Sequence, residues 1–274
     1  KMRSATMTNA FIRNWACMIR VRHPHSVTVA DAHPPRRDCY CFRCRIKFAQ
    51  QNQRGSTVRQ LTPKDLKWLE QTFAKLHDNV TILYFTEAAD CPHCRHEREL
   101  LTELTDLSHK LHLEVYNVVA DREEAEKHGV DKVPGVVLIG KQDYGVRYYG
   151  MPSNFEFRML LEDVQRISSG NSGLSEQLKQ TIATIDSPCH LEVITTPACP
   201  FTESAVRLAH QMAMESDYIS ADLVDVDDFP ELATRYNVRA APTVVVNGKH
   251  CFYGALSEFD FVSQIIEAAK ETET

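Results

Sequence analysis

An internal repeat constrains this 274-residue chain more than any other feature of its sequence. Cys91 precedes Pro134 by 43 residues, and Cys199 precedes Pro242 by the same 43 residues. After each proline a second pattern recurs, Tyr-Gly-x-x-Ser-x-Phe-x-Phe, first at 149–157 and then at 253–261. Two anchors that recur together indicate a duplicated structural unit, so we expect two successive units of the same fold.

Each unit is predicted to alternate helices with strands. Thr62 can cap a helix that has Pro63 in its first turn and apolar side chains on one face. Periodicity then predicts for the first unit a helix at 95–111 and strands at 81–85, 113–119 and 136–139. For the second unit it predicts helices at 174–185, after 199 and at 230–236, and strands at 191–195, 223–226 and 244–247. This alternation is typical of α/β proteins in which helices cover a central sheet.

Composition divides the chain into three segments. A polar stretch rich in serine and glycine at 168–175 separates the units, so we expect the first unit to span 61–170 and the second 171–274. Residues 1–60 hold 12 Lys and Arg against 2 Asp and Glu and show little apolar periodicity. We therefore predict a basic, poorly structured extension before an acidic folded body. Organelle transit peptides have a similar composition, which leaves open whether the extension belongs to the mature protein.

The sequence also argues against membrane insertion and secretion. It contains no run of about 18 apolar residues, which a transmembrane helix would need. The most apolar early stretch, 11–21, is interrupted by Arg13, Asn14 and Arg20, unlike the continuous apolar segment of a secretory signal. We therefore expect a cytoplasmic protein without a membrane partner. Net charge alone would support nucleic-acid binding by the extension, so we predict no nucleic-acid partner.

The pair Cys91 and Cys94, in the run Cys-Pro-His-Cys, is the candidate catalytic centre. It lies between a predicted strand and a predicted helix, where unpaired backbone N–H groups and the helix dipole favour an anion. Such positions lower a cysteine pKa from about 8.5 to roughly 3.5–7.5, so we predict Cys91 as the nucleophilic thiolate. Cys94, about one helical turn later, can resolve the mixed disulfide that Cys91 forms with a substrate. Pro92 and His93 complete the motif, and His93 either lowers the thiolate pKa further or is an exposed loop residue.

Metal binding is the alternative use of such cysteines. His96 follows the pair closely, but the first unit has no second Cys-x-x-Cys, so the context favours redox chemistry and we predict no metal there. In the extension, Cys39, Cys41 and Cys44, with His33 nearby, have a spacing that could ligate zinc or copper. Structural zinc usually takes four well-placed ligands, so this alternative is the less favoured one.

The second unit carries Cys199-Pro-Phe-Thr202 at the place of the first unit's cysteine pair. Thr202 stands where a resolving cysteine would be, so Cys199 cannot close a disulfide within this motif. Cys199 can still act as a single thiol, with the Thr202 hydroxyl bonded to its sulfur. The other hypothesis is a unit that persists as a scaffold or substrate platform, and the lack of a resolving partner favours it.

Four short motifs occupy equivalent places in the two units, Cys91-Pro-His-Cys94 with Val133-Pro134, and Cys199-Pro-Phe-Thr202 with Ala241-Pro242. Together with the repeated aromatic pattern they resemble the thioredoxin superfamily over roughly 61–274, and most of all its two-unit protein disulfide oxidoreductases, also called glutaredoxin-like. The resemblance implies two tandem thioredoxin-like units, each a central mixed β-sheet flanked by helices. It also implies cis peptide bonds before both prolines, with substrate contacts by Val133, Pro134, Cys199, Ala241 and Pro242.

The chain departs from thioredoxin at a position that concerns proton transfer. Thioredoxins carry a buried acid on the strand six residues before the first cysteine, whereas this chain has Phe85 there and Val193 in the second unit. Glu87 and Asp90 are the local candidates for handling a proton near Cys91.

These observations predict a thiol–disulfide oxidoreductase that reduces, forms or exchanges disulfides in protein substrates. The resemblance implies no bound cofactor beyond the redox-active disulfide, with a thioredoxin-reductase-like flavoprotein or glutathione as electron donor. One alternative is an electron relay to a peroxidase, similar to the two-unit amino-terminal module of some alkyl hydroperoxide reductase flavoproteins, which retain the cysteine pair in their second unit. The other is a redox-regulated adaptor, or a monothiol protein that holds an iron–sulfur cluster through Cys199 and glutathione.

Overall fold

The computed structural model describes residues 61–87, 92–150, 152, 155–196, 199–253 and 256–271, and for Pro92 and His93 it describes the backbone alone. The basic extension predicted at 1–60 lies outside the described residues, so its lack of structure stays a prediction. The described residues all belong to one compact body.

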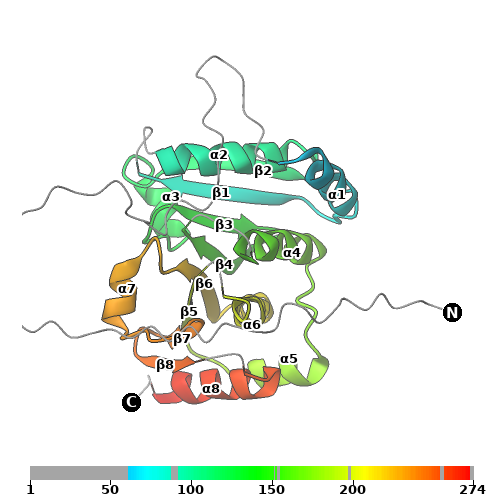
Figure 1. The fold of residues 1–274 in the computed structure, drawn as a ribbon. Helices are drawn as coiled ribbons and strands as arrows, with labels where there is room; N and C mark the ends of the chain where they lie inside the picture. The colour runs from blue at the N-terminus through cyan, green and yellow to red at the C-terminus, as the bar shows by residue number, and fades with distance from the viewer. Residues whose placement is uncertain are drawn as a thin grey trace, which may run out of the picture. The chain divides into compact units, whose positions relative to one another are not determined.

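The first unit alternates helices and strands as its sequence pattern predicts (Figure 1). Its elements are α1 (Pro63–Phe73), β1 (Val80–Thr86), α2 (Pro92–Thr105), β2 (Leu111–Asn117), α3 (Arg122–Lys127), β3 (Gly135–Ile139), β4 (Asp143–Tyr149) and α4 (Phe155–Ser169). The second unit repeats this order with α5 (Glu176–Ile182), β5 (Cys189–Thr195), α6 (Thr202–Glu215), β6 (Ile219–Asp225), α7 (Pro230–Arg235), β7 (Thr243–Val246), β8 (His250–Tyr253) and α8 (Glu258–Glu271).

All these strands form one eight-stranded sheet in the order β2-β1-β3-β4-β6-β5-β7-β8. Within the first unit β1 pairs parallel with β2 and antiparallel with β3, and β3 pairs antiparallel with β4. The second unit repeats this arrangement with β5 in the place of β1. The predicted mixed sheets are therefore confirmed, and the parallel pairing of β4 with β6 joins them into one.

Helices cover both faces of the sheet because the central strands are apolar on both sides. Along β1, Ile82 and Tyr84 belong to one core cluster, to which α1, α2, α4, α5, α6 and α8 contribute. The alternate residues Leu83 and Phe85 belong to a second cluster with α3 and α7. Burial on both faces explains why β1 has a continuous apolar run rather than an alternating one.

Two boundaries differ from the sequence prediction. The helix predicted at 95–111 is α2, which ends at Thr105, because Leu111 pairs with Val80 at the start of the β1–β2 ladder. Leu111 fits a helical spacing as well as a strand, and only the strand pairing decides between them. The hydrophobic pattern also does not predict β4 and β8, which are hairpin partners of β3 and β7.

The first helix begins as its sequence predicts. The Thr62 hydroxyl accepts a hydrogen bond from the backbone N–H of Asp65, and the Asp65 carboxylate accepts one from the N–H of Thr62, which together form a capping box. Pro63 lies in the first turn, and Leu69 and Phe73 are buried. Among the described residues, none of the helices has the length and apolar character that crossing a membrane requires.

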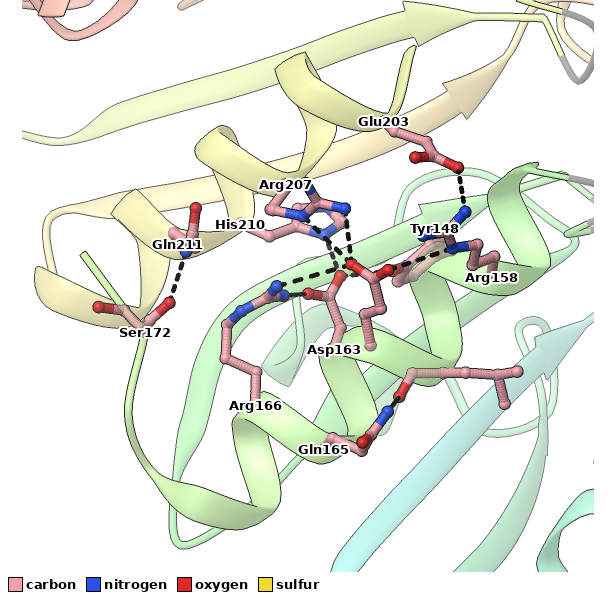
Figure 2. Close-up of polar contacts among 12 residues, drawn as sticks. Tyr148, Arg158, Asp163, Gln165, Arg166, Ser172, Glu203, Arg207, His210 and Gln211 are labelled. Carbon is pink, nitrogen blue, oxygen red and sulfur yellow. Dashed lines mark hydrogen bonds and ion pairs between the residues drawn. The ribbon is translucent and has the colours of Figure 1, made fainter. Parts of the chain in front are cut away.

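A buried polar network joins α4 of the first unit to α6 of the second (Figure 2). The carboxylate of Asp163 accepts a hydrogen bond from the Tyr148 hydroxyl at 2.5 Å and contacts His210 Nδ1 at 2.5 Å. Arg166 forms an ion pair with the same carboxylate. Nearer the surface, Arg207 contacts the Glu162 carboxylate at 2.8 Å. Since Asp163 and His210 are almost completely buried, this network is part of the packing between the units.

Candidate active site

The predicted catalytic pair lies at the start of α2. The preceding strand β1 ends at Thr86 and α2 begins at Pro92. Cys91, the predicted nucleophile, lies outside the described residues, as do the side chains of Pro92 and His93, so their predicted roles stay predictions. Cys94 is described, is partly exposed, and lies in the first turn of α2.

Cys94 is attached to the centre of the sheet through Tyr84. The Tyr84 hydroxyl donates a hydrogen bond to the backbone carbonyl of Cys94 at 3.2 Å. Tyr84 lies on β1 and is completely buried, so it fixes the first turn of α2 against the core. This contact holds the predicted resolving cysteine at a defined place above the end of β1.

A buried acid accompanies this tyrosine. Glu97 follows Cys94 by one helical turn, is completely buried, and forms a hydrogen bond with Tyr84. Burial raises the pKa of Tyr84 far above its ordinary value, and the charges of Glu97 and Cys94 act in the same direction. Tyr84 therefore stays protonated, and Tyr84, Glu97 and Cys94 form one electrostatically coupled group. An ionisable carboxyl group is costly to bury, which marks this group as a functional candidate.

Glu97 was missed by the sequence reasoning, which considered Glu87 and Asp90. Glu87 is exposed, and Asp90 lies outside the described residues. Phe85, at the strand position that thioredoxins use for their acid, is completely buried and stacks on Tyr116 with ring centroids 5.3 Å apart. A signal for Glu97 was present, because it shares one helical face with the apolar residues Leu100, Leu101 and Leu104.

The proline that follows the first site lies at the same edge of the sheet. The Val133–Pro134 peptide bond is cis, as the resemblance implies. Gly135, the next residue, pairs with Phe85 near the end of β1. The Pro134 carbonyl accepts a hydrogen bond from the N–H of Gly150 at 3.1 Å. The chain therefore brings Pro134 to the end of β1 that leads into the Cys-x-x-Cys motif.

The second unit builds a similar arrangement around a single cysteine. The Ala241–Pro242 bond is also cis, and the Cys199 thiol donates a hydrogen bond to the Ala241 carbonyl at 3.3 Å. The Thr202 hydroxyl is completely buried and bonds the hydroxyl of Thr195. The hypothesis that the Thr202 hydroxyl bonds the Cys199 sulfur is therefore wrong, because Thr195 at the end of β5 takes this hydroxyl.

The described residues hold no group of three or more His, Cys, Asp or Glu side chains arranged for a metal ion. Cys39, Cys41 and Cys44 lie outside the described residues, so their metal binding stays untested. The arrangement at the start of α2 is suited to thiol chemistry, since a helix N-terminus stabilises a thiolate and a buried acid nearby can exchange protons.

Comparisons with known proteins agree with this geometry. The model of the family described as Thioredoxin domain matches residues 189–267, and that of the AhpC/TSA family matches residues 55–165. Over 86 residues the chain is 31% identical to a thioredoxin of Methanocaldococcus jannaschii, a stretch that covers 31% of this chain and 96% of that protein. The chain belongs to the thioredoxin superfamily.

Larger relatives of this thioredoxin-superfamily protein contain two units. The chain is similar to a protein disulfide oxidoreductase from Aeropyrum pernix, with 28% identity and a TM-score of 0.72 over 78% of this chain and 96% of that one. It is also similar to the alkyl hydroperoxide reductase AhpF of Enterococcus faecalis, with 25% identity and a TM-score of 0.69 over 76% of this chain and 100% of that one. The predicted tandem thioredoxin-like fold and the class of thiol–disulfide oxidoreductase are thereby confirmed.

The chain is also 23% identical over 176 residues to the alkyl hydroperoxide reductase of the same kind from Staphylococcus aureus, covering 64% of this chain. These residues span about a third of that relative, 32% of its length. The activity of the whole relative therefore does not transfer to this protein as a finding.

Proposed function

We propose that this thioredoxin-superfamily enzyme reduces, forms or exchanges disulfides in protein substrates through Cys91 and Cys94. The observation that carries the proposal is the position of Cys94, in the first turn of α2 and bonded through its carbonyl to the buried Tyr84. The neighbouring Pro134 then offers the preceding Val133 backbone to an extended substrate segment. Ala241 and Pro242 beside Cys199 are the corresponding platform in the second unit.

The reaction in the reducing direction consists of two exchanges. The Cys91 thiolate attacks one sulfur of the substrate disulfide, a mixed disulfide forms, and the other substrate sulfur leaves as a thiolate. The Cys94 thiolate then attacks the Cys91 sulfur, which releases the second substrate sulfur and closes the Cys91–Cys94 bond. Two electrons pass from the enzyme dithiol to the substrate, and the two protons of the enzyme thiols end on the substrate thiols. The oxidising direction is the reverse of these steps.

Glu97 is the group that we assign to the proton of Cys94. The carboxylate can accept this proton as Cys94 becomes the attacking thiolate, and Tyr84 holds both partners in place. The electron donor in this proposal is a thioredoxin-reductase-like flavoprotein or glutathione, and no cofactor beyond the cysteine pair takes part in the exchange.

Insulin reduction by dithiothreitol, followed as turbidity, tests this proposal. We expect activity to disappear in Cys91→Ser, which loses the attacking thiol. In Cys94→Ser the mixed disulfide should persist and be detectable by mass spectrometry. Cys251→Ser is the matched control, because Cys251 is exposed on β8 away from both motifs. If Cys91→Ser retains full activity, the proposal fails.

The same assay separates the hypotheses for the second unit. Full activity in Cys199→Ser would support a scaffold or substrate platform, whereas a loss would indicate that this thiol takes part. A brown iron–sulfur absorbance in the purified protein would instead favour the monothiol cluster carrier, since a simple dithiol enzyme is colourless.

The similarity to the alkyl hydroperoxide reductase AhpF favours a second candidate, an electron relay between a flavoprotein reductase and a peroxidase. This candidate uses the same cysteine pair and differs only in the acceptor. Mixing the reduced protein with an oxidised cysteine peroxidase and hydrogen peroxide tests it. Rapid oxidation of Cys91 and Cys94 that requires the peroxidase would support the relay, and slow oxidation equal to that with peroxide alone would exclude it.

A further inference from the structure

A lysine of the first unit is buried against carboxylates of the second, directly before the cis proline. The side chain of Lys132 is 12% exposed, and its ammonium lies 3.2 Å from Glu192 and 4.0 Å from Asp222. It also lies 2.7 Å from the exposed Asp131 and 4.6 Å from the ring centroid of Tyr149. Glu192 and Asp222 belong to β5 and β6, so this contact crosses the boundary between the units.

The two carboxylates that receive Lys132 are themselves held in place. Glu192 is 5% exposed and accepts a hydrogen bond from the Tyr236 hydroxyl at 2.7 Å. Asp222 is 2% exposed and contacts His190 Nε2 at 2.7 Å. Burial acts to lower the pKa of Lys132, but its hydrogen bond with Asp131 and the charges of Asp222, Asp131 and Glu192 raise it overall, so the ammonium keeps its charge.

A second contact reaches the proline from the other side. Gly150 donates its N–H to the Pro134 carbonyl at 3.1 Å and has a φ of +100°, in the left-handed region that favours glycine. A Cβ atom at Gly150 would come within 2.7 Å of the Asp225 Cβ and 3.0 Å of the Asp228 Oδ2. Residues after β6 of the second unit therefore lie directly against the residue that holds Pro134.

From these two contacts we propose that the second unit positions the loop 131–134 for substrate binding by the first unit, with Lys132 as the positioning residue. The proposal rests on the proposed function, in which Val133 and Pro134 hold the substrate segment. Well-packed apolar side chains would hold the two units together at least as well as a buried ion pair. A charge network fixes the loop in one place more specifically than apolar packing does, which gives the second unit a role without a resolving cysteine.

Steady-state insulin reduction by the full chain tests this role, with KM and kcat measured separately. We expect Lys132→Met to raise KM for insulin by about fivefold or more, while kcat changes less than about twofold. Lys132→Arg should restore KM, since it keeps the charge. Alkylation of Cys91 by iodoacetamide, which needs no bound peptide, should proceed at the wild-type rate. Lys141→Met is the matched control, because Lys141 is 67% exposed and pairs with Asp78 at the surface.

Loss of a buried charge can unfold a chain, so Glu192→Gln provides a second, isosteric test. It should raise KM in the same way, and the effects of Lys132→Met and Glu192→Gln should be less than additive when combined. Folded Lys132→Met and Glu192→Gln proteins with wild-type KM would overturn the positioning role alone. Wild-type protein that does not reduce insulin would instead refute the proposed function, and the positioning role with it.

Discussion

At the scale of single residues, the informative positions are buried acids whose burial the fold must tolerate. Glu97 and Asp225 are each at most 4% exposed. An apolar residue at either position would cost the fold less than a carboxyl group does. Glu97 lies beside Tyr84 and Cys94 at the candidate site, and Asp225 lies at the end of β6 beside Gly150. Each position therefore makes a separate prediction.

Glu97→Gln should slow disulfide exchange while leaving the fold intact. The amide keeps the shape of the carboxyl group but cannot accept the Cys94 proton, so we expect the rate of insulin reduction near neutral pH to fall by about a hundredfold. The loss should shrink as pH rises, because the thiol then ionises without a base. Rates measured across the pH range, with the exposed Glu99→Gln as control, check this; equal pH profiles of Glu97→Gln and wild type would contradict it.

Asp225→Asn should stabilise the protein at high pH. Burial raises the pKa of Asp225 to about 7, and the charges of Asp228 and Asp227 add to this effect. The folded state therefore favours the protonated acid, so the associated stability is complete at low pH and is lost as pH rises through about 7.

The gain in unfolding free energy of Asp225→Asn over wild type should be about 2 kcal/mol larger at pH 8 than at pH 5. Urea unfolding at both values measures it, with the exposed Asp186→Asn as control. A gain that does not change with pH would show that Asp225 is ionised throughout.

At the scale of elements, the contact of α4 with α6 depends on the carboxylate of Asp163 (Figure 2). Burial acts to raise the pKa of Asp163, but His210 and Arg166 outweigh it and hold the pKa below its ordinary value. Asp163 therefore contributes stability that is present near neutral pH and lost as pH falls through its lowered pKa. The network thus links the two units most strongly under neutral conditions.

Asp163→Asn should lower the unfolding free energy at neutral pH by about 3 kcal/mol, because it leaves the buried Arg166 and His210 without their carboxylate. The difference from wild type should decrease in acid. Urea unfolding monitored by circular dichroism measures both effects. The control is Glu126→Gln, which removes a pair with Arg122 whose side chains are 63% and 80% exposed and should change stability by less than about 1 kcal/mol.

At the scale of the whole molecule, the two units share one sheet and two polar contacts. The pairing of β4 with β6 hydrogen-bonds the units together, and the networks around Asp163 and Lys132 add buried charges that neither unit can satisfy alone. A unit that separated would expose the edge of β4 or β6 together with these charges. We therefore expect the units to unfold together rather than as independent domains.

Unfolding of a Trp15→Phe variant tests this cooperativity. The chain has 2 tryptophans, so the variant retains only Trp68, on α1 of the first unit. Its fluorescence and the far-ultraviolet circular dichroism of the whole chain should then give coincident urea transitions. Two separated transitions would indicate that the units are independently stable.

Much of this organisation follows from the sequence alone. The duplication, the alternation of helices and strands, and the kind of chemistry at Cys91 and Cys94 depend on local spacing, and local spacing can be read directly from the chain. The start of α1 was equally predictable, because Thr62, Pro63 and Asp65 form their cap within one turn.

The tertiary structure alone decided how the units meet and which charges become buried. The sequence contains Glu97, Lys132 and Asp163 in polar runs that look like solvated surface, and the structure buries Glu97 and Asp163 completely and Lys132 largely. Their burial depends on contacts with Tyr84, Glu192 and His210, which lie between 13 and 60 residues away along the chain. The physical reason is that a hydrophobic pattern records which side chains avoid water, whereas the cost of a buried charge is offset only by a partner that folding brings to it.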